Sequence, residues 1–157
     1  GLSNRNKIGV MGVLTFISES APTAITDSYV LTFESISSEN VSQYQRLSLA
    51  SGKLGIISSK EITWTGNIGS NPAKGQFVFA VNGSSLFLLS LISDPSSYTQ
   101  NLVDFNTVKS SFKVGVPQVA TKYPLLSPEG SPEEIFKQIG LRLADFLKTS
   151  ILAWSTP

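Results

Sequence analysis

The sequence predicts an α+β fold: a central antiparallel β-sheet flanked by about three helices, with an additional C-terminal amphipathic helix. The prediction rests first on residues 75–114, where two apolar runs flank Asn82-Gly83. Asn and Gly tolerate the positive φ of a tight hairpin turn. The second run ends at Asp94-Pro95, a capping residue followed by one suited to the first helical position. Apolar residues then recur at spacings of three and four, so this segment is predicted as strand, turn, strand and helix.

Residues 8–17 are predicted to begin the sheet as a buried strand. They are mostly apolar, contain two glycines, follow Arg5 and Lys7, and precede several small residues. The same order is typical of a targeting signal, which is the alternative interpretation. Crossing a bilayer as a helix takes about 20 apolar residues, and no stretch of the chain is that long. The sequence therefore predicts no transmembrane span.

The next two segments are predicted from their apolar periodicity. Residues 27–36 alternate between two sets of side chains, with Tyr29 and Phe33 in the same set, which is typical of a strand with one buried face. Residues 41–54 instead carry apolar side chains at helical spacing, with glycines placed to end a helix. These residues are Val41, Tyr44, Leu47 and Leu54, and the glycines are Gly52 and Gly55. We therefore expect a strand followed by a helix.

Residues 56–64 alternate again and are predicted as a second strand. Residues 66–72 are dense in Gly, Asn, Ser and Pro, which indicates either a loop or a broken hairpin. The hairpin and helix of residues 75–114 then follow along the chain.

The chain closes with a connector and a helix. Residues 115–132 contain four prolines, which fix φ and remove hydrogen-bond donors, so a Pro-rich connector is predicted. Ser131-Pro132 can cap a helix, and an apolar stripe follows. We expect a helix over residues 133–154, packed on the α+β domain of residues 1–114. Its apolar face could instead bind a partner or a membrane, although mixed charges on the polar face disfavour a membrane.

Composition excludes several chemistries. The 157 residues include no His and no Cys, which removes His-based acid–base catalysis, thiol nucleophiles and the usual zinc ligands. Twelve basic and eleven acidic residues give a net charge of +1, and the basic residues are scattered. The sequence thus predicts no nucleic-acid partner, no metal, no cofactor and no enzymatic activity.

Few residues stand out as site candidates. Glu133-Glu134 suits the positive end of a helix dipole better than a catalytic carboxylate pair. An enzyme would have to use Glu34, Glu61 or Lys74. Trp64 and Trp154 could line a pocket for a lipid or pigment, although a core position is the more ordinary role of a tryptophan. For contact with a partner, the candidates are Arg5, Lys7 and Trp154.

The order strand, helix, strand, turn-rich loop, hairpin and helix over residues 29–114 resembles the PsbP-like fold. That fold includes extrinsic lumenal proteins of photosystem II, Ran-binding Mog proteins and bacterial DcrB-type lipoproteins. The matching pieces are residues 75–91, as paired long strands, and residues 98–114, as a helix running into a terminal strand, Ser111-Phe112-Lys113-Val114. The chain departs from the family in lacking a Pro-Gly-Trp-like turn near Phe16 and in continuing past residue 114.

The resemblance implies a sheet between helix layers and a non-enzymatic accessory role at a membrane complex. It also implies an exported or lumenal location, such as the thylakoid lumen or the periplasm. Our leading functional hypothesis is therefore an accessory or assembly subunit that docks on a larger, membrane-associated protein complex, with photosystem II as one example. The alternative is a binding protein for an apolar ligand such as a lipid or pigment. The oligomeric state stays open.

Overall fold

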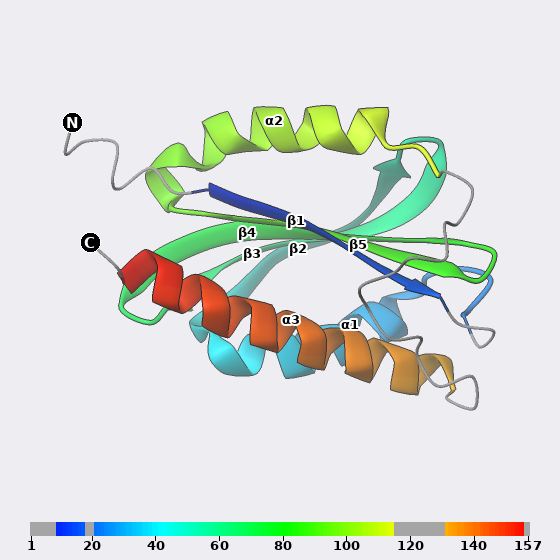
Figure 1. Ribbon diagram of the computed structural model, residues 1–157, viewed down its shortest axis with the longest axis horizontal. Coiled ribbons are helices and arrows are strands. Elements are labelled where there is room, and N and C mark those ends of the chain that lie inside the picture. Colours follow the sequence, from blue (N-terminus) through cyan, green and yellow to red (C-terminus); the bar gives the residue numbers. More distant parts are fainter. Residues whose placement is uncertain (1–8, 18–20, 115–130, 156–157) are drawn as a thin grey trace.

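The computed structural model describes residues 9–17, 21–114 and 131–155 (Figure 1). A five-stranded antiparallel sheet has the strand order β1-β5-β4-β3-β2. Its strands are β1 (Gly9–Ile17), β2 (Ser42–Leu54), β3 (Ile57–Ile68), β4 (Asn71–Asn82) and β5 (Ser85–Ser93). Helix α2 (Tyr98–Ser111) covers one face, and α1 (Asp27–Ser37) and α3 (Pro132–Ser155) cover the other (Figure 1). Short 3-10 turns, η2 (Ser38–Asn40) and η3 (Pro95–Ser97), complete the elements.

This architecture confirms the predicted α+β class. The described ranges contain three α-helices in all, so the C-terminal helix is one of the three and not an addition to them. The predicted first strand is confirmed over residues 9–17, since β1 pairs along its whole length with β5. It is an edge strand, however, and Met11 and Val13 are exposed, so the expectation that it is buried was wrong. Most of the predicted connector, residues 115–130, lies outside the described residues. Residues 112–114 form no strand, which corrects the expected terminal strand after α2.

Strands β2 to β5 form a meander whose three hairpins have two-residue turns, Gly55-Ile56, Gly69-Ser70 and Gly83-Ser84. The glycines have φ of +60°, +61° and +59°. Glycine in this conformation at the first turn position is the type II′ pattern, whose twist matches that of the paired strands. The hairpin predicted at Asn82-Gly83 is confirmed, although its turn begins one residue later because Asn82 still pairs with Ser85. Residues 66–72, predicted as a loop or a broken hairpin, instead form the end of an unbroken hairpin, because β3 and β4 stay paired up to Ile68 and Asn71.

The strand predicted over residues 27–36 is wrong, because these residues form α1. Thr26 caps the helix, since its Oγ1 accepts a hydrogen bond from the Tyr29 backbone N–H at 3.4 Å. Buried Val30 and Phe33 follow the helical spacing, whereas Leu31 is 40% exposed. The period-two pattern in this segment was therefore accidental.

The helix predicted over residues 41–54 is also wrong, because these residues form the edge strand β2. Most of its side chains are exposed, so burial alternates only weakly along it. Its pairing with β3 is interrupted between Ser42 and Gln45 and between Arg46 and Ser48, and Gln43 has φ of +54°. Such bulges shift the alternation by one residue, which left a spacing that imitates a helix.

On the face covered by α1 and α3, aromatic rings form an unbroken chain of contacts from α1 to β2. Neighbouring ring centroids in this chain lie 4.7–6.0 Å apart. The order of the rings is Tyr29, Phe136, Phe79, Phe33, Phe77, Trp64 and Tyr44. Offset and edge-to-face ring pairs add to the stabilisation that burial alone provides.

Helices α1 and α3 run in the same direction and touch closely. Tyr29 stacks on Phe136, and two turns further along α1 and one turn further along α3, Ile36 packs on Gly140. A Cβ at position 140 would lie 3.0 Å from the Ile36 Cβ, so glycine permits this approach. Up to residue 145, the apolar stripe of α3 is thus buried against its own chain. Within the described ranges, no helix is both long and apolar enough to cross a membrane.

Candidate functional site

The partner-binding residues predicted from the sequence have side chains outside the part that the structure describes, so their role stays a prediction. Arg5 and Lys7 lie outside the described residues. Trp154 belongs to the last turn of α3, but its side chain is also outside the described part. The candidate site therefore has to come from other residues.

Glu34 is engaged in a contact between α1 and the edge strand. The Tyr44 hydroxyl donates a hydrogen bond to Glu34 Oε2 at 2.7 Å, and Arg46 Nε lies 3.7 Å from the same oxygen. Burial raises the pKa of Tyr44 far above its usual value, and the hydrogen bond to Glu34 and the charge of Glu34 raise it further. This arrangement joins α1 to β2.

Glu61 and Lys74 lie on the opposite face, below α2. Glu61 forms an ion pair with Lys109 of α2, and both side chains are about one-seventh exposed, at 14% and 15%. Gly52 on the neighbouring strand leaves room for the Glu61 carboxylate, which a Cβ there would displace. Lys74 Nζ lies 4.5 Å from the centre of the Tyr98 ring, a cation–π contact. Burial raises the pKa of Tyr98.

Trp64, the other candidate for a ligand pocket, is fully buried. Its ring stacks on Tyr44 and on Phe77, with centroids 5.9 Å and 5.5 Å away. Protein rings thus pack against it where a ligand would have to lie.

The turn between β2 and β3 carries the most exposed large apolar side chain of the described residues. Ile56 is 94% exposed. The equivalent positions of the other two hairpins are Ser70 and Ser84, both polar. Turn geometry therefore does not require an apolar residue at position 56, and solvation disfavours one.

This turn is held in place by α2 (Figure 1). The Gly55 backbone N–H donates a hydrogen bond to the Lys109 carbonyl oxygen at 2.7 Å. Leu54 is fully buried in the core below α2, and any Cβ at Gly55 would collide with the Phe112 carbonyl oxygen. Ile56 is accordingly presented from a turn that is held by the Leu54–Ile57 strand pair and by the bond of Gly55 to α2. Pre-ordering of this kind lowers the entropic cost of binding.

Two open grooves flank the turn. The first, with a volume of about 730 Å³, lies where the loop before α1 meets the β2–β3 hairpin, and Lys53 and Lys60 line it. Lys60 Nζ lies 3.0 Å from Asp27 Oδ1 and donates to Ser51 Oγ at 3.2 Å. Lys53 Nζ is 3.5 Å from Ser58 Oγ.

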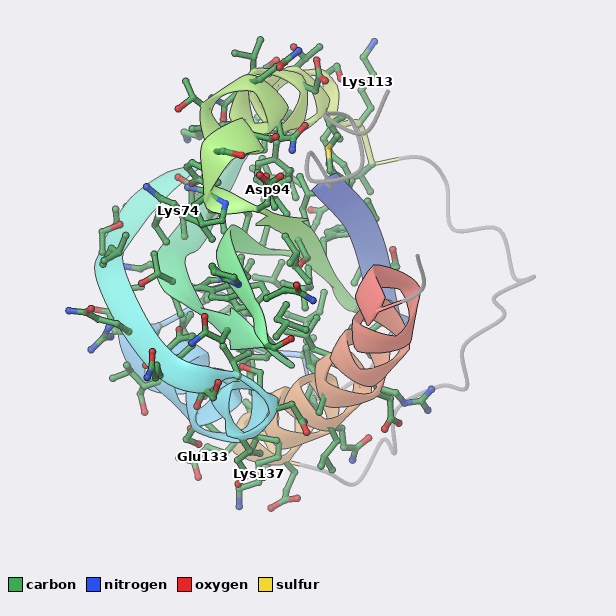
Figure 2. The ribbon with its side chains drawn as sticks, turned by 90° about the vertical axis from the view of Figure 1, so that its left-hand side faces the viewer. Lys74, Asp94, Lys113, Glu133 and Lys137 are labelled. Atoms are coloured by element: carbon green, nitrogen blue, oxygen red, sulfur yellow. The ribbon has the colours of Figure 1, made fainter. Side chains whose placement is uncertain are left out.

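The second groove has a volume of about 620 Å³ and lies between the turn and the end of α2. Ile56, Phe112, Lys113 and Val114 are among the residues that line it. Figure 2 shows Lys113 beyond α2, on the side of the sheet opposite Lys137 and Glu133. Neither groove is lined by Glu34, Glu61 or Lys74. We name the surface made by Ile56, Lys53, Lys60 and Lys113 with the two grooves the Ile56 surface.

Sequence reasoning missed the Ile56 surface because it placed residues 41–54 in a helix. That assignment made Gly55 a helix stop, and the turn disappeared with it. One signal was present: Gly55-Ile56 lies between two runs that can pair as strands, and each of the next two hairpins also turns at a glycine.

No model of a known protein family matches the sequence, and no curated protein matches it either. Two solved structures are similar. A Pseudomonas aeruginosa protein of unknown function, PA94, suggested to be a regulator, has a TM-score of 0.53 and 8% identity over 71% of this chain and 86% of that one. Cyanobacterial PsbP from Synechocystis sp. PCC 6803 has a TM-score of 0.50 and 17% identity over 73% of this chain and 71% of that one.

Identities this low indicate a shared fold and nothing about activity. The similarity confirms the resemblance stated from the sequence, although the element order used to argue it was wrong over residues 27–54, where a helix precedes a strand. The protein has a PsbP-like fold.

Proposed function

We propose that this protein is a non-catalytic accessory subunit that docks on a larger, membrane-associated protein complex through the Ile56 surface. The observation that carries the proposal is the isoleucine presented in full to solvent on a turn that α2 holds rigid. Interface anchors are typically apolar or aromatic side chains that enter a pocket of the partner and are surrounded by polar contacts. The PsbP-like fold supports an accessory role, and with it an exported or lumenal location.

The expected contribution of Ile56 is measurable. Full burial of an isoleucine side chain is worth about 1.5–3 kcal/mol. Because 1.4 kcal/mol corresponds to a tenfold change, removing the side chain should weaken docking by about 10- to 100-fold. A loss of that size would release most of the protein from a complex of moderate affinity.

The test is Ile56→Ser, which gives the turn the residue found in its two sister hairpins. We expect the wild-type protein to elute with a high-mass assembly when a native extract is separated by size, and Ile56→Ser to elute at the mass of the free protein. Ser70→Ala, at the equivalent position of the β3–β4 turn, is the matched control and should stay in the assembly. If Ile56→Ser elutes with the wild type, the docking role of this turn is wrong.

The same preparation addresses the apolar-ligand alternative. Native mass spectrometry of the free protein would show a bound small molecule if the protein were a carrier. A bound lipid or pigment together with an unchanged elution of Ile56→Ser would favour that function over docking.

A further inference from the structure

We infer that the partner is a protein whose docking surface is acidic, with carboxylates placed around the pocket that receives Ile56. This inference rests on the proposed function, because it specifies the partner of the same surface. It is carried by the positions of three lysines relative to the turn, by the lack of acidic residues along both grooves, and by the shape of those grooves.

Lysines stand on both sides of Ile56. Lys53 and Lys60 line the first groove, and Lys113 lines the second groove together with Ile56 itself. No acidic residue of the described chain lines either groove. The whole chain has a net charge of only +1, so this local excess of positive charge is a property of one end of the molecule.

The three lysines are not equally available to a partner. Lys60 already forms an ion pair with Asp27 at 3.0 Å. Among the described residues, Lys53 and Lys113 form no ion pair, and both are exposed. A partner carboxylate would thus gain most from Lys53 on one side of the turn and from Lys113 on the other. Charges at such rim positions mainly raise the association rate and select the partner.

Lipid would also attract lysines, but the shape of the surface favours protein. The grooves offer concave volumes of about 730 Å³ and 620 Å³ beside a protruding side chain. Protein side chains can fill such volumes, and their carboxylates can also accept hydrogen bonds from Ser51 and Ser58, which are exposed in the first groove. A fluid bilayer cannot match fixed grooves, and one isoleucine gives less membrane binding than a single acyl chain, whose binding is itself marginal.

The experiment uses a charge-reversed double variant, Lys53→Glu with Lys113→Glu, in the same size separation of native extract. We expect its affinity for the assembly to fall at least about tenfold, because carboxylates would then face carboxylates. The double variant Lys53→Arg with Lys113→Arg should remain bound. Lys137→Glu reverses a single charge on α3, away from the Ile56 surface, and this variant should also remain bound.

Salt provides a second measurement. Raising the ionic strength should weaken docking of the wild-type protein and the arginine variant, because exposed charge pairs are screened. It should not weaken docking of the glutamate variant further. A salt-independent wild-type complex would contradict an acidic partner surface.

Vesicles provide the third arm. After sedimentation with vesicles of phosphatidylglycerol and phosphatidylcholine, we expect the wild-type protein to stay in solution. If the wild-type protein instead binds the vesicles, and Lys53→Glu with Lys113→Glu abolishes that binding, the inference is overturned in favour of a lipid surface. If Ile56→Ser leaves the assembly while the glutamate variant stays bound, the acidic partner is wrong and the docking proposal stands. If Ile56→Ser and the glutamate variant both stay bound, the docking proposal and the acidic partner surface are both wrong.

Discussion

The two faces of the sheet are packed by different chemistry. The face below α1 and α3 is held by the chain of aromatic rings described above, with Phe33 at its centre. Within the described ranges, the face below α2 has one aromatic pair, Phe87 with Phe112, and adds the Glu61–Lys109 ion pair and the Lys74–Tyr98 contact. Apolar burial dominates the first face, where the Glu34 carboxylate lies at the contact with β2 and its ionic partner Arg46 is 37% exposed. On the second face both partners of the Glu61–Lys109 pair have lost most of their water.

The two faces also differ in their relation to the Ile56 surface. No residue of the aromatic chain lines either groove. Lys109, in contrast, pairs with Glu61 through its side chain and accepts the hydrogen bond of Gly55 through its carbonyl oxygen. The face below α2, which we call the ionic face, therefore fixes the turn that carries Ile56. Substitutions on the α1/α3 face should mainly lower stability, whereas substitutions on the ionic face should also release this turn.

The largest effect on stability should come from Phe33→Ala. Phe33 is fully buried and meets Phe77 and Phe79 at centroid distances of 5.2 Å and 4.7 Å. Its truncation removes these contacts and leaves a cavity, so we expect the free energy of unfolding to fall by about 3–5 kcal/mol in urea titrations. The fraction that remains folded should still bind the assembly with wild-type affinity. Weaker binding by folded Phe33→Ala would show that the two faces are coupled.

A smaller loss should follow Lys109→Met, which leaves the Glu61 carboxylate largely desolvated without a partner. Because the Glu61–Lys109 pair is neither fully exposed nor fully buried, we expect the free energy of unfolding to fall by about 1–3 kcal/mol, between the losses typical of exposed and of buried ion pairs. The double variant Lys109→Met with Glu61→Leu should recover much of this loss, because no buried charge remains.

Hydrogen exchange can locate the effect of Lys109→Met. The Gly55 amide bonds to the Lys109 carbonyl oxygen, so its protection should fall beyond what the change in global stability explains. Phe33→Ala, compared at equal stability, should leave Gly55 protected. Equal loss of Gly55 protection in both variants would refute a specific role for the ionic face in fixing the turn.

Local turn and cap chemistry in the sequence predicted much of this fold. The hairpin after β4 and the helix starting at Ser131-Pro132 follow from residues whose backbone preferences are strong. The helix after Asp94-Pro95 is also present, but Pro95 begins the 3-10 turn η3, α2 starts at Tyr98, and the Asp94 side chain makes no cap hydrogen bond. The errors fall where apolar spacing was the only guide. In α1, Tyr29 and Leu31 imitate a strand although Thr26 caps a helix, and in β2 the bulges imitate a helix.

The candidate site was less predictable than the fold. An exposed isoleucine is recognisable only after its segment is known to be a turn, and the hairpin assignment of residues 54–57 depends on pairing with β3 rather than on local preference. Lys53 and Lys113 are 60 positions apart in the sequence. The packing of the hairpin against the end of α2 brings them to one end of the molecule, and no local pattern encodes that.

The smallest effect should come from Tyr44→Phe, which tests the outer end of the aromatic chain. At neutral pH the variant loses the hydrogen bond to Glu34, so we expect the free energy of unfolding to fall by about 0.5–1.5 kcal/mol. The pKa of Tyr44 is raised in the folded state above the unfolded value of about 10. Its contribution to stability is therefore present below pH 10 and is lost as the pH rises beyond it, because only the unfolded chain then releases the proton.

Urea titrations between pH 8 and about pH 11 should show this loss in the wild-type protein and a weaker one in Tyr44→Phe. Tyr98→Phe, on the ionic face, is the matched comparison. Burial raises both pKa values, but the hydrogen bond to Glu34 raises that of Tyr44, whereas the hydrogen bond to Thr63 lowers that of Tyr98. Tyr98→Phe should accordingly reduce the loss of stability at high pH by less than Tyr44→Phe does. A greater relief in Tyr98→Phe would mean that the ionic face, and not the contact between α1 and β2, limits stability at high pH.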